Sequence, residues 1–366
     1  MADKIRVGIV GATVTQGGSG WGEHAHVPAL KALPNYELKA VCTSHEDTAK
    51  ASAAAFGAER AFHRFSDMTS APDVDLIVVC VRVPGHRDLV MAGLQADKAV
   101  FCEWPLGKTL GEAQEMAALA TQRSLKTAVG LQARSEPAIL YARDLIRDGY
   151  VGEVLTANLT TSAQAQLQRG PGRIWQGDRA NGANTMTIAG GHAIDALCAV
   201  LGELAEVSAR VSTRIPEWRN LEGATVKVDA PDSINVIGRM TSGAEVSVNI
   251  AAVPSNPGGN RLEIYGREGA LVIQAKGALS LGPCQIQGGR GKEPMGAMPI
   301  PSKYRFVPEG TPAGQPYNVA QAYVRLADAL RAGRSFDVDF NLAVKRHALI
   351  DAIERSSATG RSVKLV

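Results

Sequence analysis

The amino-acid sequence predicts an α/β protein: an N-terminal doubly wound domain with a parallel sheet, and a C-terminal α+β domain with an open, largely antiparallel sheet. Three observations lead to this prediction. The chain has 366 residues, more than a single hydrophobic core usually organises. Its first third alternates short apolar runs with helical patterns, as a parallel sheet covered on both faces requires. After Gly152 the apolar runs instead follow one another, with turn signals between them.

The N-terminal domain is expected to span residues 1–132. Its first run, IRVGIV, ends at Gly11, and apolar residues at helical spacing return from Glu23. The expected strands are 5–10, 36–43, 74–81 and 98–104. The expected helices are 23–33, 46–57 and 86–97. The second of these helices is rich in alanine and closes with Gly57, a typical residue for a helix end.

The C-terminal domain is expected to span residues 133–366, with its last helices able to pack back on the first domain. The expected strands are 154–163, 205–213, 233–240, 244–253, 261–266 and 270–275. The expected helices are 184–201, 317–332 and 342–359. The stretch 283–316 is rich in glycine and proline, which predicts an irregular surface segment.

Composition and charge indicate a soluble globular protein. The 39 basic and 36 acidic residues are spread evenly, without the Lys/Arg block that follows a nucleic-acid backbone. No stretch reaches the roughly 20 apolar residues of a membrane span, and the N-terminus has no signal core. Five widely spaced cysteines favour buried thiols in a reducing compartment. We therefore expect a cytoplasmic protein that binds neither nucleic acid nor membrane. His24 and His26 lack cysteines at metal-ligand spacing, so no metal is expected.

A glycine-rich loop, GATVTQGGSGWGEHAHVPAL, follows the first strand at residues 11–30. A dinucleotide needs close backbone approach to its pyrophosphate and a helix N-terminus facing the anion, and glycines supply that room. The spacing is not the compact G-x-G-x-x-G, because Thr13 stands at the second glycine and a longer turn, 15–22, follows. A plain glycine-rich turn is the alternative, but its place after the first strand favours a cofactor loop. The expected cofactor contacts in this loop are Gly11, Ala12, Thr13, Gly20 and Trp21.

The tip of the second strand bears on the choice of cofactor. An Asp or Glu there usually binds the ribose diol of NAD, and here Thr43, Ser44 and His45 stand in its place. Small hydroxyls and a histidine leave room and donors for a 2′-phosphate, which a carboxylate would repel. NADP is therefore preferred over NAD, although the nearby Glu46 argues for NAD.

Four segments together resemble a known family. They are GIVGA at 8–12, the run around FCEWPLG at 78–113, GLQAR at 130–134, and NTMTIAGGHAIDAL at 184–197. Over nearly its whole length the chain resembles the glucose-fructose oxidoreductase, inositol dehydrogenase and rhizopine catabolism (Gfo/Idh/MocA) family. The segment SGWGEHAHVPAL and the EWPL variant are most similar to the branch that contains the yeast galactose-pathway repressor, a non-enzymatic member that still binds NADP or NAD.

The resemblance implies a Rossmann domain, a second domain with an open mixed sheet, and oxidation or reduction of sugars, polyols and related compounds. Because that sheet often joins subunits in the family, a homodimer or homotetramer through the C-terminal sheet is expected. The resemblance also implies that the cofactor contacts Val81, His86, Glu103 and Trp104.

The sequence departs from the family pattern at two polar positions. The usual Glu-Lys-Pro motif is Glu103-Trp104-Pro105 here, so the lysine that takes part in hydride-transfer chemistry is missing. The family's aspartate four residues before the second-domain histidine is Ile188, whereas the histidine itself is kept as His192. Of the three polar groups around the reacting carbon, the sequence keeps His192 alone.

His192 and Asp195 are the candidate catalytic pair. Residues three apart share one face of a helix, so the carboxylate is expected to orient the imidazole and raise its pKa. A histidine of near-neutral pKa can take a proton from a hydroxyl as hydride leaves the carbon. The alternative is that the pair only bridges the helix beneath the sheet. The two glycines before His192 indicate close backbone approach to another group.

Trp104 has two interpretations: a flat wall against the nicotinamide or the substrate, or a filler of the lysine's space in a member that has lost catalysis. The substrate is also expected to contact Gln132 and Arg134, at the end of the strand after the Glu-Trp-Pro motif, together with Trp175 and His192.

The leading hypothesis is an NADP- or NAD-dependent oxidoreductase that acts on a sugar, a polyol or a related hydroxyl or carbonyl compound, with His192 as acid and base. The rival hypothesis is a non-catalytic regulator that binds NADP and a protein partner. The alanine-rich composition and the compact length favour the enzyme.

Overall fold

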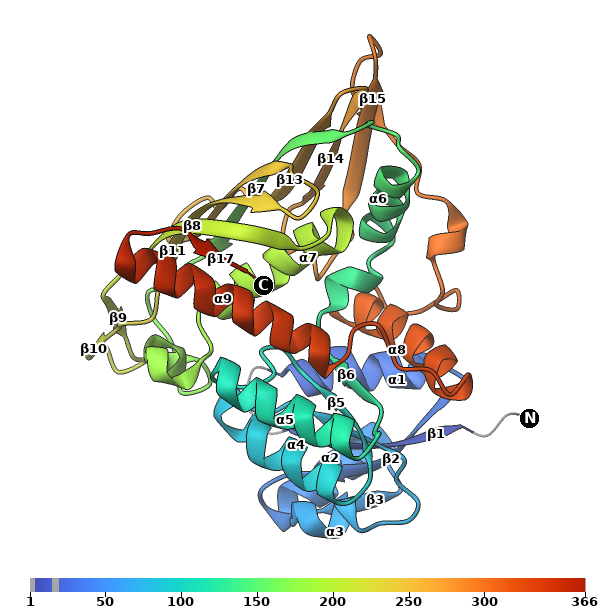
Figure 1. The fold of residues 1–366 in the computed structure, drawn as a ribbon. Coiled ribbons are helices and arrows are strands. Elements are labelled where there is room, and N and C mark those ends of the chain that lie inside the picture. Colours follow the sequence, from blue (N-terminus) through green and yellow to red (C-terminus); the bar gives the residue numbers. More distant parts are fainter. Residues whose placement is uncertain (1–3, 15–19, 366) are drawn as a thin grey trace.

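The computed structural model describes residues 4–14 and 20–365, and Figure 1 shows its two domains. The five residues 15–19 of the predicted glycine loop lie outside the described residues. The first domain contains a six-stranded, wholly parallel sheet in the order β3-β2-β1-β4-β5-β6. Its strands are β1 (Ile5–Val10), β2 (Tyr36–Cys42), β3 (Arg60–Phe62), β4 (Leu76–Val79), β5 (Ala99–Cys102) and β6 (Thr127–Val129). This order and direction confirm the predicted doubly wound parallel sheet.

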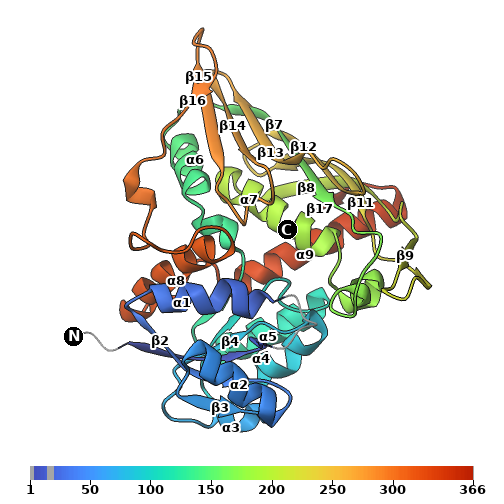
Figure 2. The ribbon, with the colours of Figure 1, turned by 180° about the vertical axis from the view of Figure 1, so that it is seen from behind.

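Helices cover both faces of the first sheet, as Figures 1 and 2 show from opposite sides. They are α1 (Val27–Ala32), α2 (Glu46–Phe56), α3 (Phe65–Thr69), α4 (His86–Gln95) and α5 (Leu110–Gln122). A single π-helical turn, Gly22–His26, precedes α1. Every residue of β4 is buried, which is why that strand reads as continuously apolar.

The second domain contains a nine-stranded sheet in the order β16-β15-β14-β13-β7-β12-β11-β8-β17. Its strands are β7 (Val154–Gln164), β8 (Leu204–Ser212), β11 (Ser233–Met240), β12 (Glu245–Val253), β13 (Gly259–Gly266), β14 (Gly269–Ala275), β15 (Gln285–Arg290), β16 (Gly296–Ala297) and β17 (Val363–Lys364). Neighbouring strands are antiparallel except for β7 and β12, which run parallel. A separate hairpin is formed by β9 (Glu217–Arg219) and β10 (Thr225–Lys227). The largely antiparallel sheet is as predicted.

Strand β15 corrects the expectation that 283–316 is irregular. Glycine is found in this strand because neighbouring side chains leave no room for a Cβ: one added at Gly288 would lie 2.5 Å from Sδ of Met298. The stretch therefore continues the sheet beside β14, although its composition resembles that of a loop.

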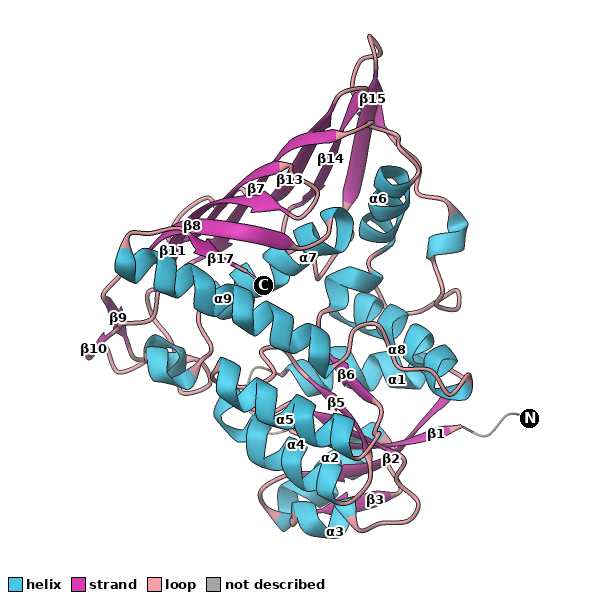
Figure 3. Cartoon of the chain, viewed as in Figure 1, coloured by secondary structure: helices cyan, strands magenta, loops and turns pink. Residues whose placement is uncertain are grey.

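The helices of the second domain lie on one side of its sheet and leave the other face uncovered, as Figure 3 shows. They are α6 (Pro137–Arg147), α7 (Gly191–Leu201), α8 (Gln315–Arg331) and α9 (Phe340–Thr359). Of these, α8 is placed farther from the sheet, beside α1 of the first domain. A π-helical turn, Met186–Gly190, leads into α7. Helix α9 contacts both β8 and α5, and α8 contacts α1, so the last two helices join the domains.

Trp104, two residues after β5, is a buried side chain that packs between the two domains. It is 5% exposed, and its indole Nε1 donates a hydrogen bond of 2.7 Å to the carbonyl of Thr187 in the π-helical turn. Its ring centroid lies 4.7 Å from that of His347 on α9. A Cβ added at Gly191 would lie 2.5 Å from the indole nitrogen. The close approach predicted from the two glycines is therefore an approach to Trp104.

This packing gives a prediction about acid stability. Burial lowers the pKa of His347 to about 4, from an ordinary value near 6.5. Between these values the unfolded chain binds a proton that the folded chain does not, so stability falls as the pH drops from 6.5 to about 4. The contribution is on the order of 3 kcal/mol at most. We expect His347→Phe to flatten this part of the Tm profile.

The measurement is thermal unfolding between pH 7 and pH 4. The matched control is His63→Phe, at an exposed position of the first domain. A wild-type profile that His347→Phe leaves unchanged would contradict the assignment.

Candidate functional site

A cavity of about 860 Å³ lies between the two domains, above the carboxyl ends of the first sheet's strands. Such edges are where ligands gather in parallel α/β sheets. Many of the predicted site residues line it: Gly11, Thr13, Gly20, Trp21, Val81, His86, Glu103, Trp104, Gln132, Trp175 and His192. The structure thus brings the glycine loop, the Glu-Trp-Pro turn and the second-domain histidine together.

The glycine loop makes a tight turn at the floor of this cavity. Gly11 has φ of +97°, and a Cβ there would lie 2.6 Å from the carbonyl oxygen of Cys80. A Cβ at Gly22 would lie 2.9 Å from Cα of Ala12, which is itself fully buried beneath the turn and does not line the cavity. Only glycines permit this approach, and the resulting bare backbone suits a pyrophosphate.

The tip of β2 lies outside the main cavity. Thr43 donates a hydrogen bond of 3.0 Å to the carbonyl of His45, and Ser44 and His45 are exposed. The carboxylate of Glu46 is paired with Lys50 at 2.7 Å, and this hydrogen bond and charge lower the pKa of Glu46. Its carboxylate is therefore already engaged by a cation one turn along the helix.

Glu103 is held by a chain of polar side chains. It is 8% exposed, and its carboxylate accepts from Nε2 of His26 at 2.9 Å and from Nε2 of Gln132 at 3.0 and 3.2 Å. Nδ1 of His26 lies 2.7 Å from the hydroxyl of Tyr323 on α8. Because an ionised carboxylate only accepts, His26 donates through Nε2 and accepts from Tyr323 when it is neutral. His26 and Tyr323 do not line the cavity but support Glu103 from behind it, and no local sequence signal pairs them because they come from opposite ends of the chain.

His86 also lines the cavity, where its ring is fixed between two carbonyl groups. Its Nδ1 lies 2.9 Å from the oxygen of Pro105 and its Nε2 lies 3.1 Å from the oxygen of Val81. Burial lowers its pKa. The ring therefore joins the end of β4 to the Glu-Trp-Pro turn.

His192 presents one ring nitrogen to the cavity. Its Nδ1 is buried and has no hydrogen-bond partner among the described residues, which leaves Nε2 as the accessible nitrogen. Burial lowers the pKa of His192, against smaller opposite effects of the Glu103 and Asp195 carboxylates. The sequence predicted a raised pKa, and this is wrong because desolvation of the imidazole outweighs both charges.

Asp195 and Arg134 form an ion pair with each other and do not line the cavity. Nε of Arg134 donates to both carboxylate oxygens at 2.9 and 3.0 Å, and Nε of Arg346 on α9 lies 3.3 Å away. Asp195 is fully buried, so two cations offset its desolvation. In the described part of the chain no hydrogen bond joins Asp195 to His192. Both side chains are paired with each other in this structure, and the expected orienting role of Asp195 and the expected substrate contact of Arg134 stay predictions.

Trp175 lies on the 3-10 turn Ile174–Gly177, which covers the cavity from the second domain. Its indole Nε1 donates to the carbonyl of Gly172 at 2.9 Å, and the guanidinium of Arg82 lies 5.7 Å from its ring. The same loop brings Arg173 and Gln176 to the cavity, which the sequence analysis missed. The available signal was the position of Arg173 and Gln176 within two residues of the predicted Trp175.

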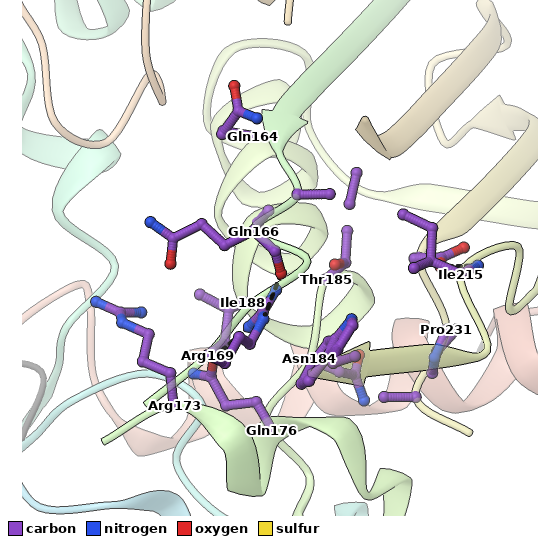
Figure 4. Close-up of a pocket in the computed structure, with 16 residues that line it drawn as sticks. Gln164, Gln166, Arg169, Arg173, Gln176, Asn184, Thr185, Ile188, Ile215 and Pro231 are labelled. Carbon is purple, nitrogen blue, oxygen red and sulfur yellow. Dashed lines mark hydrogen bonds between the residues drawn. The ribbon is translucent and has the colours of Figure 1, made fainter. Parts of the chain in front are cut away.

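A second cavity of about 290 Å³ adjoins the first on the side of the second sheet, and Figure 4 shows its lining. The two share Arg173, Gln176, Ile188 and Ala189. Ile188 stands where the family has its aspartate, so an apolar side chain lines both cavities at that position, whereas His192 lines the first cavity only.

Three further findings concern the predicted classes of site. The five cysteines are buried thiols, as predicted. Among residues 4–14 and 20–365, no group of three or more His, Cys, Asp or Glu side chains is arranged to hold a metal ion. No helix in the described part of the chain has the length and apolar character that a membrane crossing requires.

Comparison with known proteins identifies relatives of both domains. Residues 5–131 match the family described as "Oxidoreductase family, NAD-binding Rossmann fold", and residues 137–275 match "Gal80p, C-terminal domain". The dehydrogenase aclE of Aspergillus oryzae is 31% identical, over 99% of this chain and 98% of its own length. The levoglucosan dehydrogenase of Pseudarthrobacter phenanthrenivorans is 25% identical, over 74% of this chain and 73% of its own.

A solved structure has the same fold along the whole chain. It is a super-repressor mutant of Gal80p from Saccharomyces cerevisiae, with a TM-score of 0.86 and 23% identity, covering 99% of this chain and 98% of its own. The glycine loop, the Glu-Trp-Pro turn and the helix of His192 therefore occur in a two-domain frame shared by dehydrogenases and a regulator. With a 31% identical relative along its length and a family match over its first domain, the chain belongs to the Gfo/Idh/MocA oxidoreductase family, as its motifs predicted.

Proposed function

We propose that the protein is an NADP- or NAD-dependent oxidoreductase that transfers a hydride between a nicotinamide cofactor and a sugar, a polyol or a related hydroxyl or carbonyl compound. One observation carries the proposal: a single cavity is lined by the glycine loop on one side and by His192 on the other. The Gfo/Idh/MocA family and the dehydrogenase relatives support it.

The residues of the first domain fit a dinucleotide. The bare backbone at Gly11 leaves space for the pyrophosphate, with Thr13, Gly20 and Trp21 around it. Thr43, Ser44 and His45 would meet the adenosine ribose, and Val81, His86, Glu103 and Trp104 would meet the nicotinamide half. When bound, the nicotinamide supplies or takes up the hydride.

His192 is the proposed acid and base. Because burial keeps its pKa below the ordinary value, the imidazole is neutral at neutral pH and can accept a proton. In the oxidation direction the substrate hydroxyl gives its proton to Nε2 of His192 while its carbon gives up a hydride, and a carbonyl remains. In the reduction direction Nε2 returns the proton to the carbonyl oxygen. The fixed carboxylate of Glu103 stabilises the charged imidazolium.

Trp104 replaces the family lysine without replacing its chemistry. The indole N–H is committed to the carbonyl of Thr187, and an indole neither gives nor takes protons near neutral pH. Trp104 is proposed to be a wall of the cavity that holds the domains at the angle the cofactor needs.

A second candidate function is a non-catalytic regulator that binds NADP and a protein. The match of residues 137–275 to the C-terminal domain of Gal80p favours it, as does the missing lysine. The two candidates share a cofactor site, and they differ in whether His192 carries out chemistry.

The proposed assembly is a homodimer or homotetramer through the uncovered face of the second sheet, in the cytoplasm. Leu155, Ile237 and Tyr265 are exposed large side chains on strands of that sheet. Analytical ultracentrifugation is expected to show a dimer or tetramer, which Ile237→Asp weakens because it buries a charge. A monomer at micromolar concentration would contradict this proposal.

The role of His192 gives a prediction. With NADPH or NADH and a panel of sugars, polyols and ketones, His192→Ala is expected to lower kcat by about 100-fold or more, because it removes the proton acceptor. Cofactor binding, measured by nicotinamide fluorescence, is expected to stay within about two-fold. The matched change Trp104→Ala is expected to raise the cofactor or substrate Kd while turnover remains measurable. Full turnover in both variants would refute the mechanism.

The cofactor preference gives another prediction. Ser44→Asp places a carboxylate at the exposed tip of β2, where it repels a 2′-phosphate and can bind a ribose diol. We expect the Kd for NADPH to rise by about ten-fold, or about 1.4 kcal/mol, with little change for NADH. Ser242→Asp, in an exposed turn of the second domain, is the control. Equal effects on both cofactors would argue against 2′-phosphate recognition at this tip.

A further inference from the structure

The second cavity contains two cations that the function described so far does not use. Figure 4 shows Gln166 and Arg173 on one side and Ile215 and Pro231 on the other, with Arg169 and Ile188 between them and Gln164 above. The walls come from the end of β7, the loop that carries Trp175, the π-helical turn before α7, and the connection between β8 and β11. The cavity is therefore an extension of the cofactor cleft into the second domain.

Arg169 is held in place by neutral groups only. Its guanidinium lies 3.6 Å from the ring centroid of Trp218. Its Nε donates to the carbonyl of Gln166 at 3.1 Å, and its Nη1 donates to Oε1 of Gln176 at 3.2 Å. Within the described part of the chain no carboxylate lies within ion-pair distance of it. A half-buried guanidinium is thus fixed in orientation, with its charge uncompensated.

Arg173 brings a second positive charge to the same cavity. It is exposed, and among the described residues it too has no carboxylate partner. Burial, with a further effect of the Arg173 charge, lowers the pKa of Arg169 to about 10. Two like charges without a counter-ion are unfavourable in a partly desolvated space, and a bound anion would offset that cost.

The only acid among the described lining residues does not supply the missing charge. Asp232 accepts backbone hydrogen bonds from Arg214 and Ile215, each of 2.7 Å, one on each carboxylate oxygen. It is 7% exposed and is turned to the backbone of the neighbouring loop. The remaining polar lining consists of four side-chain amides, the hydroxyl of Thr185 and the indole of Trp218, which are neutral groups beside the two guanidinium groups.

We propose that this second cavity binds an oxyanion of the substrate through Arg169 and Arg173, so that the substrate is an acidic hydroxyl or carbonyl compound. The inference rests on the proposed function, since it places the reacting carbon at His192 and the anion beyond Ile188. Guanidinium groups bind carboxylates and phosphates with charge-assisted hydrogen bonds, and a fixed planar fork makes them selective. A volume of about 290 Å³ suits a small-molecule group and not a peptide helix.

The first test measures anion binding without cofactor. Isothermal titration at constant ionic strength uses malonate, inorganic phosphate and inorganic sulfate on the wild type and on the double variant Arg169→Gln/Arg173→Gln. We expect at least one of these anions to bind, and the double variant to weaken that binding at least ten-fold. Arg179→Gln, whose guanidinium is paired with Glu354 outside the cavity, is the control and should bind as the wild type does. Arg169→Lys/Arg173→Lys keeps both charges but loses the planar forks, so it should bind more weakly than the wild type and more tightly than the Gln double variant, which separates loss of charge from a folding defect.

The outcomes separate the possible sources of the anion. Binding of malonate alone indicates a carboxylate substrate, and binding of phosphate or sulfate indicates a phosphorylated or sulfated one. Equal affinity in the wild type and the Gln double variant, or no binding of any of the three, would overturn the proposal. Arginine-dependent binding of an acidic peptide without binding of the small anions would also overturn it, in favour of a protein partner.

The second test measures turnover with matched compounds, D-glucuronate against D-glucose and D-galacturonate against D-galactose. We expect the acid to have the higher kcat/KM by ten-fold or more in the wild type, and the Gln double variant to lose this preference through KM. NADPH affinity is measured in the same samples. Absence of cofactor binding would count against the proposed function, whereas normal cofactor binding and turnover with no preference for acids would count against the anion site alone.

Discussion

The arrangement of the site depends on the contact of Trp104 with the second domain. The indole follows β5 of the first sheet, donates to the carbonyl of Thr187, and packs against Gly191 and His347. One side chain thus joins the Glu-Trp-Pro turn, the start of the helix that carries His192, and α9. The tryptophan that removes the family lysine is also what sets the position of the histidine that remains.

The charges around the cavity are divided between structure and chemistry. Asp195 pairs with Arg134 and Arg346 in the interior, and Glu203 pairs with Arg346 as the second carboxylate, so these charges hold α7 and α9 without lining the cavity. Glu103 is likewise held by His26 and Gln132, yet it borders the cavity and acts on His192. His192 has no hydrogen-bond partner for its buried nitrogen among the described residues. Its imidazole lines the cavity and is not committed to another described side chain, and this suits a proton carrier.

Local patterns were sufficient to predict the frame of the protein. The run IRVGIV forms β1 with the same bounds, because a short, largely apolar segment rich in β-branched residues and followed by glycine favours a strand. The close approaches at Gly11 and at the two glycines before His192 could also be predicted, because a glycine leaves room for another group beside the backbone. The strand β15 was not predicted, because its glycines are typical of turns. In the structure they stand where neighbouring groups leave no room for a side chain.

The partners of the polar side chains were not predictable from the sequence. The spacing of His192 and Asp195 placed them on one helix, but Asp195 is bound by Arg134 and Arg346, from distant segments whose approach only the fold determines. Tyr323 reaches His26 across almost the whole chain for the same reason. Residue type indicated which side chains can carry a proton or a charge. Tertiary packing determined which of these side chains are engaged by hydrogen bonds or ion pairs.

The most direct test of the account is a titration of the purified protein with NADPH and with NADH, in which nicotinamide fluorescence reports binding. Carbonyl compounds are then added to the protein with its bound cofactor. Three tryptophans line the cavity, so a bound reduced nicotinamide should also quench their emission. The account predicts saturable binding, stronger for NADPH, and loss of the nicotinamide signal with at least one carbonyl compound. Tight binding with no oxidation by any compound would contradict the catalytic role of His192 and leave the regulator as the better description.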